Sequence, residues 1–265
     1  MRDDLLGDGL IQAAPHPTSS FVALLETLEV TPGPVPQSTS DAVTVPEGTT
    51  VLALRYAEGV VMVGDRQATE GYSVSHRRIQ KVFAADDFSA VAISGTAGLA
   101  LEMVRLFQTE LEHYEKLEGV RLSLDGKANF LARLVRQQLP LAFQGLVVVP
   151  LFAGYDELAE AGRLYTFDVV GGRYEEIDHG ATGSGGREAK AYLRASYVAE
   201  SSEDEALGIG LRALVAAAEE DTATAGPDLR RGIYPNVVTV TSVGFSEVAE
   251  DRIAEIAGDA LETVQ

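Results

Sequence analysis

The stretch VPEGTTVLALRY, Val45 to Tyr56, decides how this chain is interpreted. Proline, acid and glycine give way abruptly to Thr49 and Thr50, which open the apolar strand VLALRY. After the turn residues AEG, the segment VVMVGD has the composition of a second strand and ends at Asp65. Two such runs around a short glycine turn are typical of a β-hairpin. The stretch therefore predicts that a folded domain begins at Thr49.

Residues 1–48 differ in composition from the rest of the chain. They contain six of the ten prolines, nine serines or threonines, and Phe21 as their single aromatic residue. A proline-broken polar segment of this kind is typical of a flexible linker or tail. Composition alone leaves two interpretations open, which are a disordered tail and a propeptide that is removed.

Charge and cysteine content restrict the function classes. The formal net charge of −19 disfavours nucleic acid and anionic membranes, since both require clustered Lys and Arg. The absence of cysteine excludes disulfides and thiol nucleophiles. The four histidines lie far apart, and no apolar run suits a bilayer span. We expect a cytoplasmic protein without metal, cofactor, nucleic acid or membrane partner.

From Thr49 onward, hairpin strands alternate with pairs of helices. Strands are expected in the segments RRIQKVF, FSAVAISG, VVVPLFAGYD, RLYTFDVVGGRYEEID and NVVTVTSVG. Helices are expected within residues 96–119, 127–143, 187–199, 203–220 and 247–261. Hairpin connections make antiparallel sheets, and helix pairs must cover the sheet faces. This order predicts an α+β fold, with two stacked antiparallel sheets and helices outside.

The junction Gly48-Thr49-Thr50 is the candidate catalytic motif. If the Gly48–Thr49 bond is cut, Thr49 carries a hydroxyl nucleophile and a free α-amine on one residue. Such an amine has a pKa of ~7.7–8.0 and can act as general base. Before the cut the nitrogen is an amide without basicity, so residues 1–48 would keep the site inactive. Other familiar motifs are missing from the sequence: there is no P-loop and no G-x-S-x-G, and Glu188 spoils the dinucleotide pattern of GSGGRE.

Further motifs accompany this junction. They are Gly64-Asp65-Arg66, Lys81-Val82, Ser94 to Gly98, Gly183-Ser184-Gly185 and Asp221 to Thr224, together with the segments ELEHYEKLEG and GPDLRRGIYP. In this combination, residues 49–265 resemble proteasome β subunits, particularly those of actinobacteria, which are N-terminal-nucleophile hydrolases. The resemblance implies a four-layer αββα sandwich and a threonine endopeptidase, with residues 1–48 as a propeptide removed by autocatalysis.

The resemblance also implies roles for individual residues. Thr49 would be the nucleophile, Asp65 and Lys81 a buried ion pair beside it, and the Gly95 N–H a donor to the oxyanion. Taken alone, Asp65 and Lys81 would be interpreted as a strand-ending aspartate and a surface lysine.

Ser184 and Asp221 are implied to orient the Thr49 amine, and Thr224 is implied as a further residue of the catalytic site. The segment DTATA departs here from the D-S-A-S-G of many relatives. Threonine keeps the hydroxyl at position 224, whereas Ala225 gives up the backbone freedom of glycine.

Substrate contacts follow from the same correspondence. The backbones of Thr69 and Ala97 would pair with an extended peptide. The positions that match the first specificity pocket are Ala68, Ile79, Phe83, Ile93, Ala97 and Leu101. All six are apolar, which predicts cleavage after hydrophobic residues; the alternative is that they are ordinary core residues.

The implied assembly is a homo-heptameric β ring stacked against proteasome α-subunit rings. A ring-shaped unfolding ATPase would deliver unfolded protein substrates through the α ring. Two alternatives stay open on the sequence alone: a ring subunit without activity, and another N-terminal-nucleophile amidase that acts on small amides.

Overall fold

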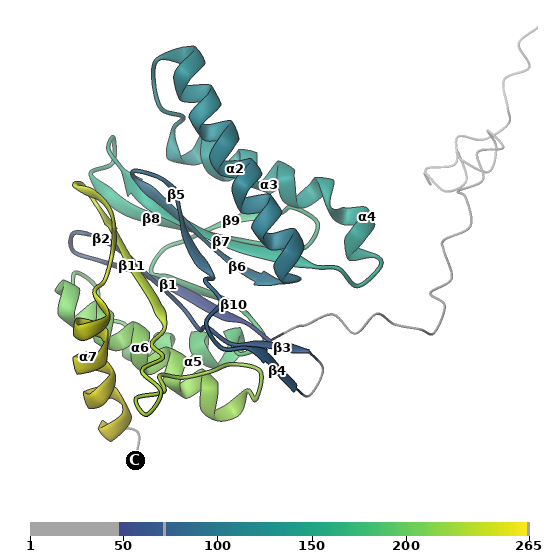
Figure 1. The fold of residues 1–265 in the computed structure, drawn as a ribbon. Helices are drawn as coiled ribbons and strands as arrows, with labels where there is room; N and C mark the ends of the chain where they lie inside the picture. The colour runs from purple at the N-terminus through teal and green to yellow at the C-terminus, as the bar shows by residue number, and fades with distance from the viewer. Residues whose placement is uncertain (1–47, 71–72, 264–265) are drawn as a thin grey trace, which may run out of the picture. The chain divides into compact units, whose positions relative to one another are not determined.

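The computed structural model describes residues 48–70 and 73–263 (Figure 1). The predictions made for residues 1–47 therefore lie outside the described residues. No helix in the described ranges is both long and apolar enough to cross a membrane.

Two five-stranded antiparallel sheets form the centre of the domain. The first has the order β10-β1-β2-β11-β12 and the second the order β5-β6-β7-β8-β9. The strands of the first sheet are β1 (Thr50–Tyr56), β2 (Gly59–Gly64), β10 (His179–Gly183), β11 (Asn236–Thr241) and β12 (Gly244–Glu247). Those of the second are β5 (Val82–Asp86), β6 (Ser89–Gly95), β7 (Val148–Asp156), β8 (Ala161–Phe167) and β9 (Arg173–Glu176). A separate small hairpin joins β3 (Ala68–Glu70) to β4 (Ser73–His76).

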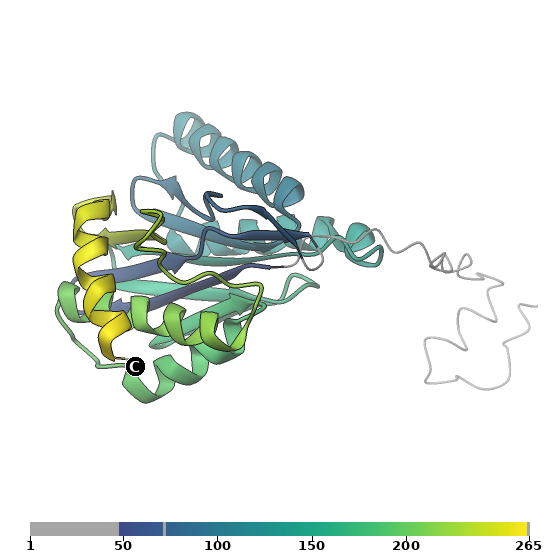
Figure 2. The same cartoon turned by 60° about the horizontal axis from the view of Figure 1, so that its bottom comes forward.

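Helices cover the outer face of each sheet (Figures 1 and 2). On the second sheet lie α2 (Ala97–Glu118) and α3 (Leu124–Gln137), followed by the short α4 (Leu139–Ala142). On the first sheet lie α5 (Gly186–Ser196), α6 (Glu203–Glu220) and α7 (Glu250–Thr263). The order of layers is helix, sheet, sheet, helix, which confirms the predicted αββα fold class.

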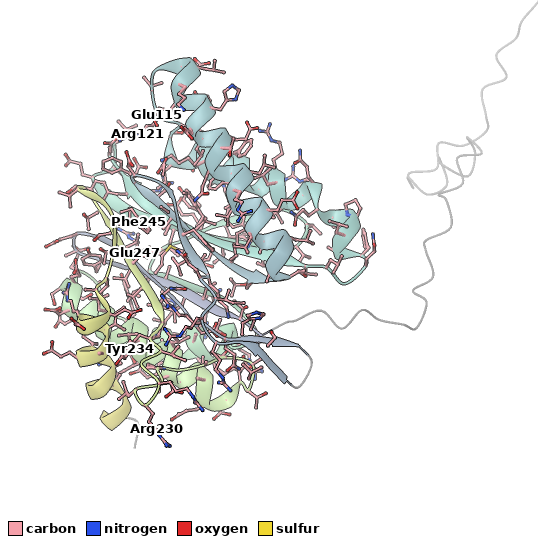
Figure 3. All side chains as sticks on the ribbon, in the orientation of Figure 1. Glu115, Arg121, Arg230, Tyr234, Phe245 and Glu247 are labelled. Atoms are coloured by element: carbon pink, nitrogen blue, oxygen red, sulfur yellow. The ribbon has the colours of Figure 1, made fainter. Side chains whose placement is uncertain are left out.

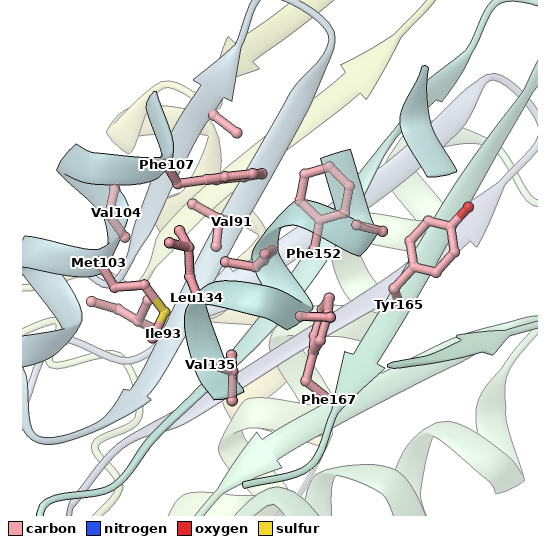
Figure 4. Packing of buried hydrophobic residues seen from close by; sticks show 14 of the residues in the cluster. Val91, Ile93, Met103, Val104, Phe107, Leu134, Val135, Phe152, Tyr165 and Phe167 are labelled. Atoms are coloured by element: carbon pink, nitrogen blue, oxygen red, sulfur yellow. The ribbon is translucent and has the colours of Figure 1, made fainter. Parts of the chain in front are cut away.

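The alternation of side chains along β1 explains this layering. Val51 and Ala53 point into the hydrophobic cluster between the two sheets, whereas Leu52 and Leu54 point into the cluster under α5 and α6. Successive residues of a strand face opposite sides, so a strand that is buried on both faces reads as a continuous apolar run. Between the second sheet and its helices, Phe107 of α2 packs edge-on against Phe152 of β7 (Figure 4).

The structure differs from the sequence prediction in some elements. The single helix expected over residues 127–143 is divided at Gln138, because Pro140 sits in the first turn of α4 and cannot continue the hydrogen bonding of α3. The short strands β3, β4, β10 and β12 were not expected. The last helix begins at Glu250 rather than Glu247.

An ion-pair cluster secures the end of α2 (Figure 3). Gly119, at a φ of 69°, ends the helix, and the chain then returns through Arg121. The Arg121 Nε lies 3.4 Å from Glu115 Oε1, and its guanidinium lies 4.4 Å from the ring centroid of Phe88. These contacts connect the end of α2 to the turn between β5 and β6.

Candidate active site

Thr49 lies directly before β1 and is buried in the described chain, with 7% of its surface exposed. Its carbonyl oxygen accepts a hydrogen bond from the Ser184 N–H at 2.9 Å. The neighbouring Gly183 has a φ of 100°, and a Cβ there would lie 1.8 Å from the Thr49 oxygen. Only glycine permits this close approach of two backbones, so Gly183 fixes the position of Thr49 against β10.

Two polar groups meet at the carbonyl oxygen of Gly48. The Thr49 hydroxyl donates to it at 2.8 Å, and the Lys81 ammonium donates at 3.3 Å. The carbonyl of the bond that the sequence marked for cleavage thus touches both the predicted nucleophile and a buried cation.

Lys81 and Asp65 form a buried ion pair. The distance from Lys81 Nζ to Asp65 Oδ1 is 2.6 Å, and Asp65 is fully buried. Asp65 also accepts the backbone N–H groups of Thr50 at 2.9 Å and Gln67 at 3.0 Å. Burial lowers the pKa of the Lys81 ammonium, and the negative charge of Asp65 opposes that shift. Groups with perturbed pKa values cluster at functional sites, and this marks Lys81 as a candidate catalytic group.

A second acidic group, Asp221, is linked to Thr49 through Ser184. Asp221 Oδ2 accepts the hydroxyls of Ser184 and Thr224, each at 2.5 Å. The Ser184 hydroxyl also reaches the Thr49 carbonyl oxygen at 3.4 Å. Ala225 adopts no left-handed backbone conformation, so the loss of glycine there leaves the segment intact.

The predicted substrate residues divide into two groups. A small cavity of about 20 Å³ is lined by Gly48, Thr49 and Gly95, and by the predicted pocket residues Ala68, Ile79, Ile93, Ala97 and Leu101. Phe83 instead packs against the hydrophobic cluster under α2 and α3. Thr69 lies on β3, where the pairing with β4 shifts register after Ala68.

Three residues of this neighbourhood were not predicted to take part. The Gln67 carbonyl accepts the Lys81 ammonium at 2.5 Å, and the Asn236 side-chain oxygen accepts the Lys81 backbone N–H at 3.0 Å. Thr50 was expected only as a residue that opens the strand, yet its hydroxyl has two polar partners. The position of Thr50 beside the junction was a usable signal, whereas nothing in the sequence distinguishes Gln67 or Asn236.

The described residues contain no group of three or more His, Cys, Asp or Glu placed to hold a metal ion. The groups that surround the Gly48–Thr49 bond are the Thr49 hydroxyl, the Asp65–Lys81 ion pair and backbone N–H and carbonyl groups. Two stacked antiparallel sheets between helix layers, with a buried threonine directly before the first strand, are the architecture and site of the N-terminal-nucleophile hydrolases.

Comparison with known proteins assigns the chain to one family within this class. The proteasome subunit family matches residues 45–227 of the chain. The proteasome subunit beta of Acidimicrobium ferrooxidans is 52% identical over 241 residues, which cover 91% of this chain and 88% of that protein. The proteasome subunit beta of Streptomyces griseus is 50% identical over 221 residues, covering 83% and 79%. The chain belongs to the proteasome subunit family, as a β subunit of the bacterial 20S type, and β subunits are threonine-type endopeptidases of protein degradation.

Proposed function

We propose that the chain is a precursor that removes residues 1–48 by cleaving its own Gly48–Thr49 bond. The observation that carries this proposal is the convergence of the Thr49 hydroxyl and the Lys81 ammonium on the Gly48 carbonyl oxygen. A cation at that oxygen favours the negative charge that develops when the carbonyl carbon is attacked. The Thr49 oxygen bonds to this carbon, the carbon–nitrogen bond of the Gly48–Thr49 peptide breaks, and the hydroxyl proton passes to the freed Thr49 nitrogen. Water then hydrolyses the ester between Gly48 and the Thr49 oxygen, which releases residues 1–48 as a carboxylate.

Cleavage creates the catalytic form by freeing the Thr49 amine. This amine takes the hydroxyl proton as the Thr49 oxygen attacks a substrate carbonyl, and the Gly95 N–H stabilises the oxyanion. The same amine then activates the water that releases the acyl group. Ser184, Asp221 and Thr224 orient the amine; the hydrogen bonds among these three side chains support this role.

Cleavage after hydrophobic residues of unfolded proteins is the proposed specificity. The apolar lining of the cavity beside Thr49 supports it. Its volume of about 20 Å³ holds about one water molecule, which is too little for a large side chain. Because Gly48 itself forms part of the lining, departure of residues 1–48 would enlarge the pocket.

A β subunit of this family implies assembly with α subunits in a 20S particle. Within that particle, we propose that seven copies of this chain form each β ring and that the β rings stack against α rings. An unfolding ATPase ring on the α ring would supply unfolded chains. Confinement of Thr49 in such a chamber would protect folded proteins.

Co-expression with the α subunit tests the proposal. The assembled wild-type particle should hydrolyse a peptide with Leu or Tyr before the cleaved bond at least about tenfold faster than one with Asp there, since a single methylene group in a hydrophobic pocket contributes ~1–3 kcal/mol. The Thr49→Ala particle should be inactive on both. Equal turnover by Thr49→Ala would contradict the proposed nucleophile, and faster cleavage after Asp would contradict the proposed pocket.

A further inference from the structure

The residue after the nucleophile, Thr50, is hydrogen-bonded to Asp65 directly and to Asp221 through the Thr224 hydroxyl. The Thr50 backbone N–H donates to Asp65 Oδ1 at 2.9 Å. Its side-chain oxygen lies 2.6 Å from the Thr224 hydroxyl, which in turn donates to Asp221 Oδ2 at 2.5 Å. Thr50, which is covalently bonded to Thr49, is therefore connected by hydrogen bonds to Asp65 and, through Thr224, to Asp221.

The direction of each hydrogen bond can be worked out from proton counting. An ionised carboxylate only accepts hydrogen bonds, so the Thr224 hydroxyl must donate its single proton to the hydrogen bond with Asp221. In the contact between the two hydroxyls, Thr50 must then be the donor. The Thr50 oxygen in turn accepts from the Gly185 backbone N–H at 2.9 Å. The chain thus runs in one direction, from the Gly185 N–H through Thr50 and Thr224 to Asp221.

Burial makes this chain rigid and sensitive to change. Thr50 is fully buried and Thr224 is 5% exposed, so water cannot replace a missing partner. Space is limited as well, because a Cβ on Gly185 would lie 2.7 Å from the Thr50 hydroxyl oxygen and 2.9 Å from that of Thr224. The glycine at 185 allows both hydroxyls to approach the start of α5.

We propose that Thr50 is a positioning residue for catalysis, which aligns Asp221 with Thr49 through the directed chain Gly185–Thr50–Thr224–Asp221. The inference rests on the proposed roles of Thr49 and Asp221. Thr50 does not touch the substrate; it holds the acceptor face of Asp221 toward the Ser184 hydroxyl, which reaches the Thr49 backbone. Removal of its hydroxyl leaves the Gly185 N–H unpaired and frees Thr224 to turn.

The test uses the full chain co-expressed with its α subunit, with kcat and KM measured on a peptide that has a hydrophobic residue at the cleaved bond. Thr50→Val keeps the shape of the side chain and removes the hydroxyl. It should lower kcat about 10–100-fold and leave KM within about twofold, since a displacement near 1 Å can cost about 100-fold in rate. Thr50→Ser restores the donor and should return kcat to within about threefold of wild type.

Two comparisons separate positioning from loss of stability. Thr239→Val removes a buried hydroxyl from β11 of the same sheet, outside the chain of hydrogen bonds, and should leave kcat within about twofold. Thr224→Val should match Thr50→Val, and the double variant should be no slower than either single one, because residues that act as a unit are not additive.

The proposal is overturned if Thr50→Val keeps wild-type kcat, if Thr50→Ser is as slow as Thr50→Val, or if the two single effects multiply. If Thr50→Val does not assemble, Gly185→Ala carries the test, because its Cβ displaces both hydroxyls without removing either. It should lower kcat with KM unchanged, and an unchanged kcat overturns the proposal. Failure of the proposed function is recognised separately, as activity that survives Thr49→Ala.

Discussion

Replacement of Lys81 by methionine separates the electrostatic from the catalytic role of the buried ion pair. Methionine fills a similar volume but removes the ammonium that contacts Asp65, Gln67 and Gly48. Asp65 is fully buried and would keep only backbone N–H partners, chiefly those of Thr50 and Gln67. Breaking a buried pair from one side costs about 3–5 kcal/mol, because an uncompensated charge is left in the interior.

That cost should be visible in thermal unfolding of the full-length chain followed by circular dichroism. For a domain of this size, each kcal/mol shifts the melting temperature by about 2–4 °C, so Lys81→Met should lower it by about 6–20 °C. Addition of Asp65→Asn removes the orphaned charge and should recover at least about 1 kcal/mol. Neither variant should cleave the Gly48–Thr49 bond.

Lys127→Met is the matched control. Lys127 lies on α3, is 4% exposed, and pairs with Asp86 Oδ2 of β5 at 2.6 Å. It should lose stability to a similar or somewhat smaller degree, yet keep cleavage and peptide hydrolysis. The reasoning is refuted if Lys81→Met lowers stability by less than about 1 kcal/mol. It is equally refuted if Lys127→Met loses activity along with Lys81→Met.

Two further predictions address backbone geometry and pH. Gly183→Ala should abolish cleavage of the Gly48–Thr49 bond, since its Cβ would lie 1.8 Å from the Thr49 oxygen. Gly119 also has a positive φ but faces open space, so Gly119→Ala should cost only about 1 kcal/mol of stability and keep its activity. Equal behaviour of the two variants in mass and activity assays would contradict this prediction. Burial lowers the pKa of His179, so the unfolded chain binds more protons below about pH 6.5 and stability should fall as the pH drops through that range. His179→Gln should reduce this loss in urea titrations at pH 5 and 7 whereas the exposed His113→Gln should not, and an identical pH dependence in both variants would contradict the assignment.

The sequence predicts the layered fold because the deciding interactions are local. The continuous apolar runs of β1 and β7 mark strands that are buried on both faces, and Ser202 caps α6 with Glu205 three residues later. Short strands such as β12 carry too few residues for a pattern to stand out. Their positions depend on pairing with β11, which the sequence does not display.

The candidate site is predictable only in part, for a related reason. Thr49, Asp65 and Lys81 stand in distinctive motifs, and resemblance to a family assigns them roles. Thr50 and its partner Thr224 are separated by 174 positions, and only the folded chain brings their hydroxyls to 2.6 Å. Hydrogen bonds between residues so far apart in the sequence produce no recognisable sequence pattern. The directed chain of hydrogen bonds through Thr50 is therefore visible only in the folded structure.

The central claim is that Thr49 becomes the N-terminus of the working enzyme. The most direct measurement is the intact mass of the β chain taken from particles assembled with the α subunit. The account predicts a chain that begins at Thr49 in the wild type and a full-length chain in Thr49→Ala. A wild-type chain that retains Gly48 in particles that hydrolyse peptide would contradict it.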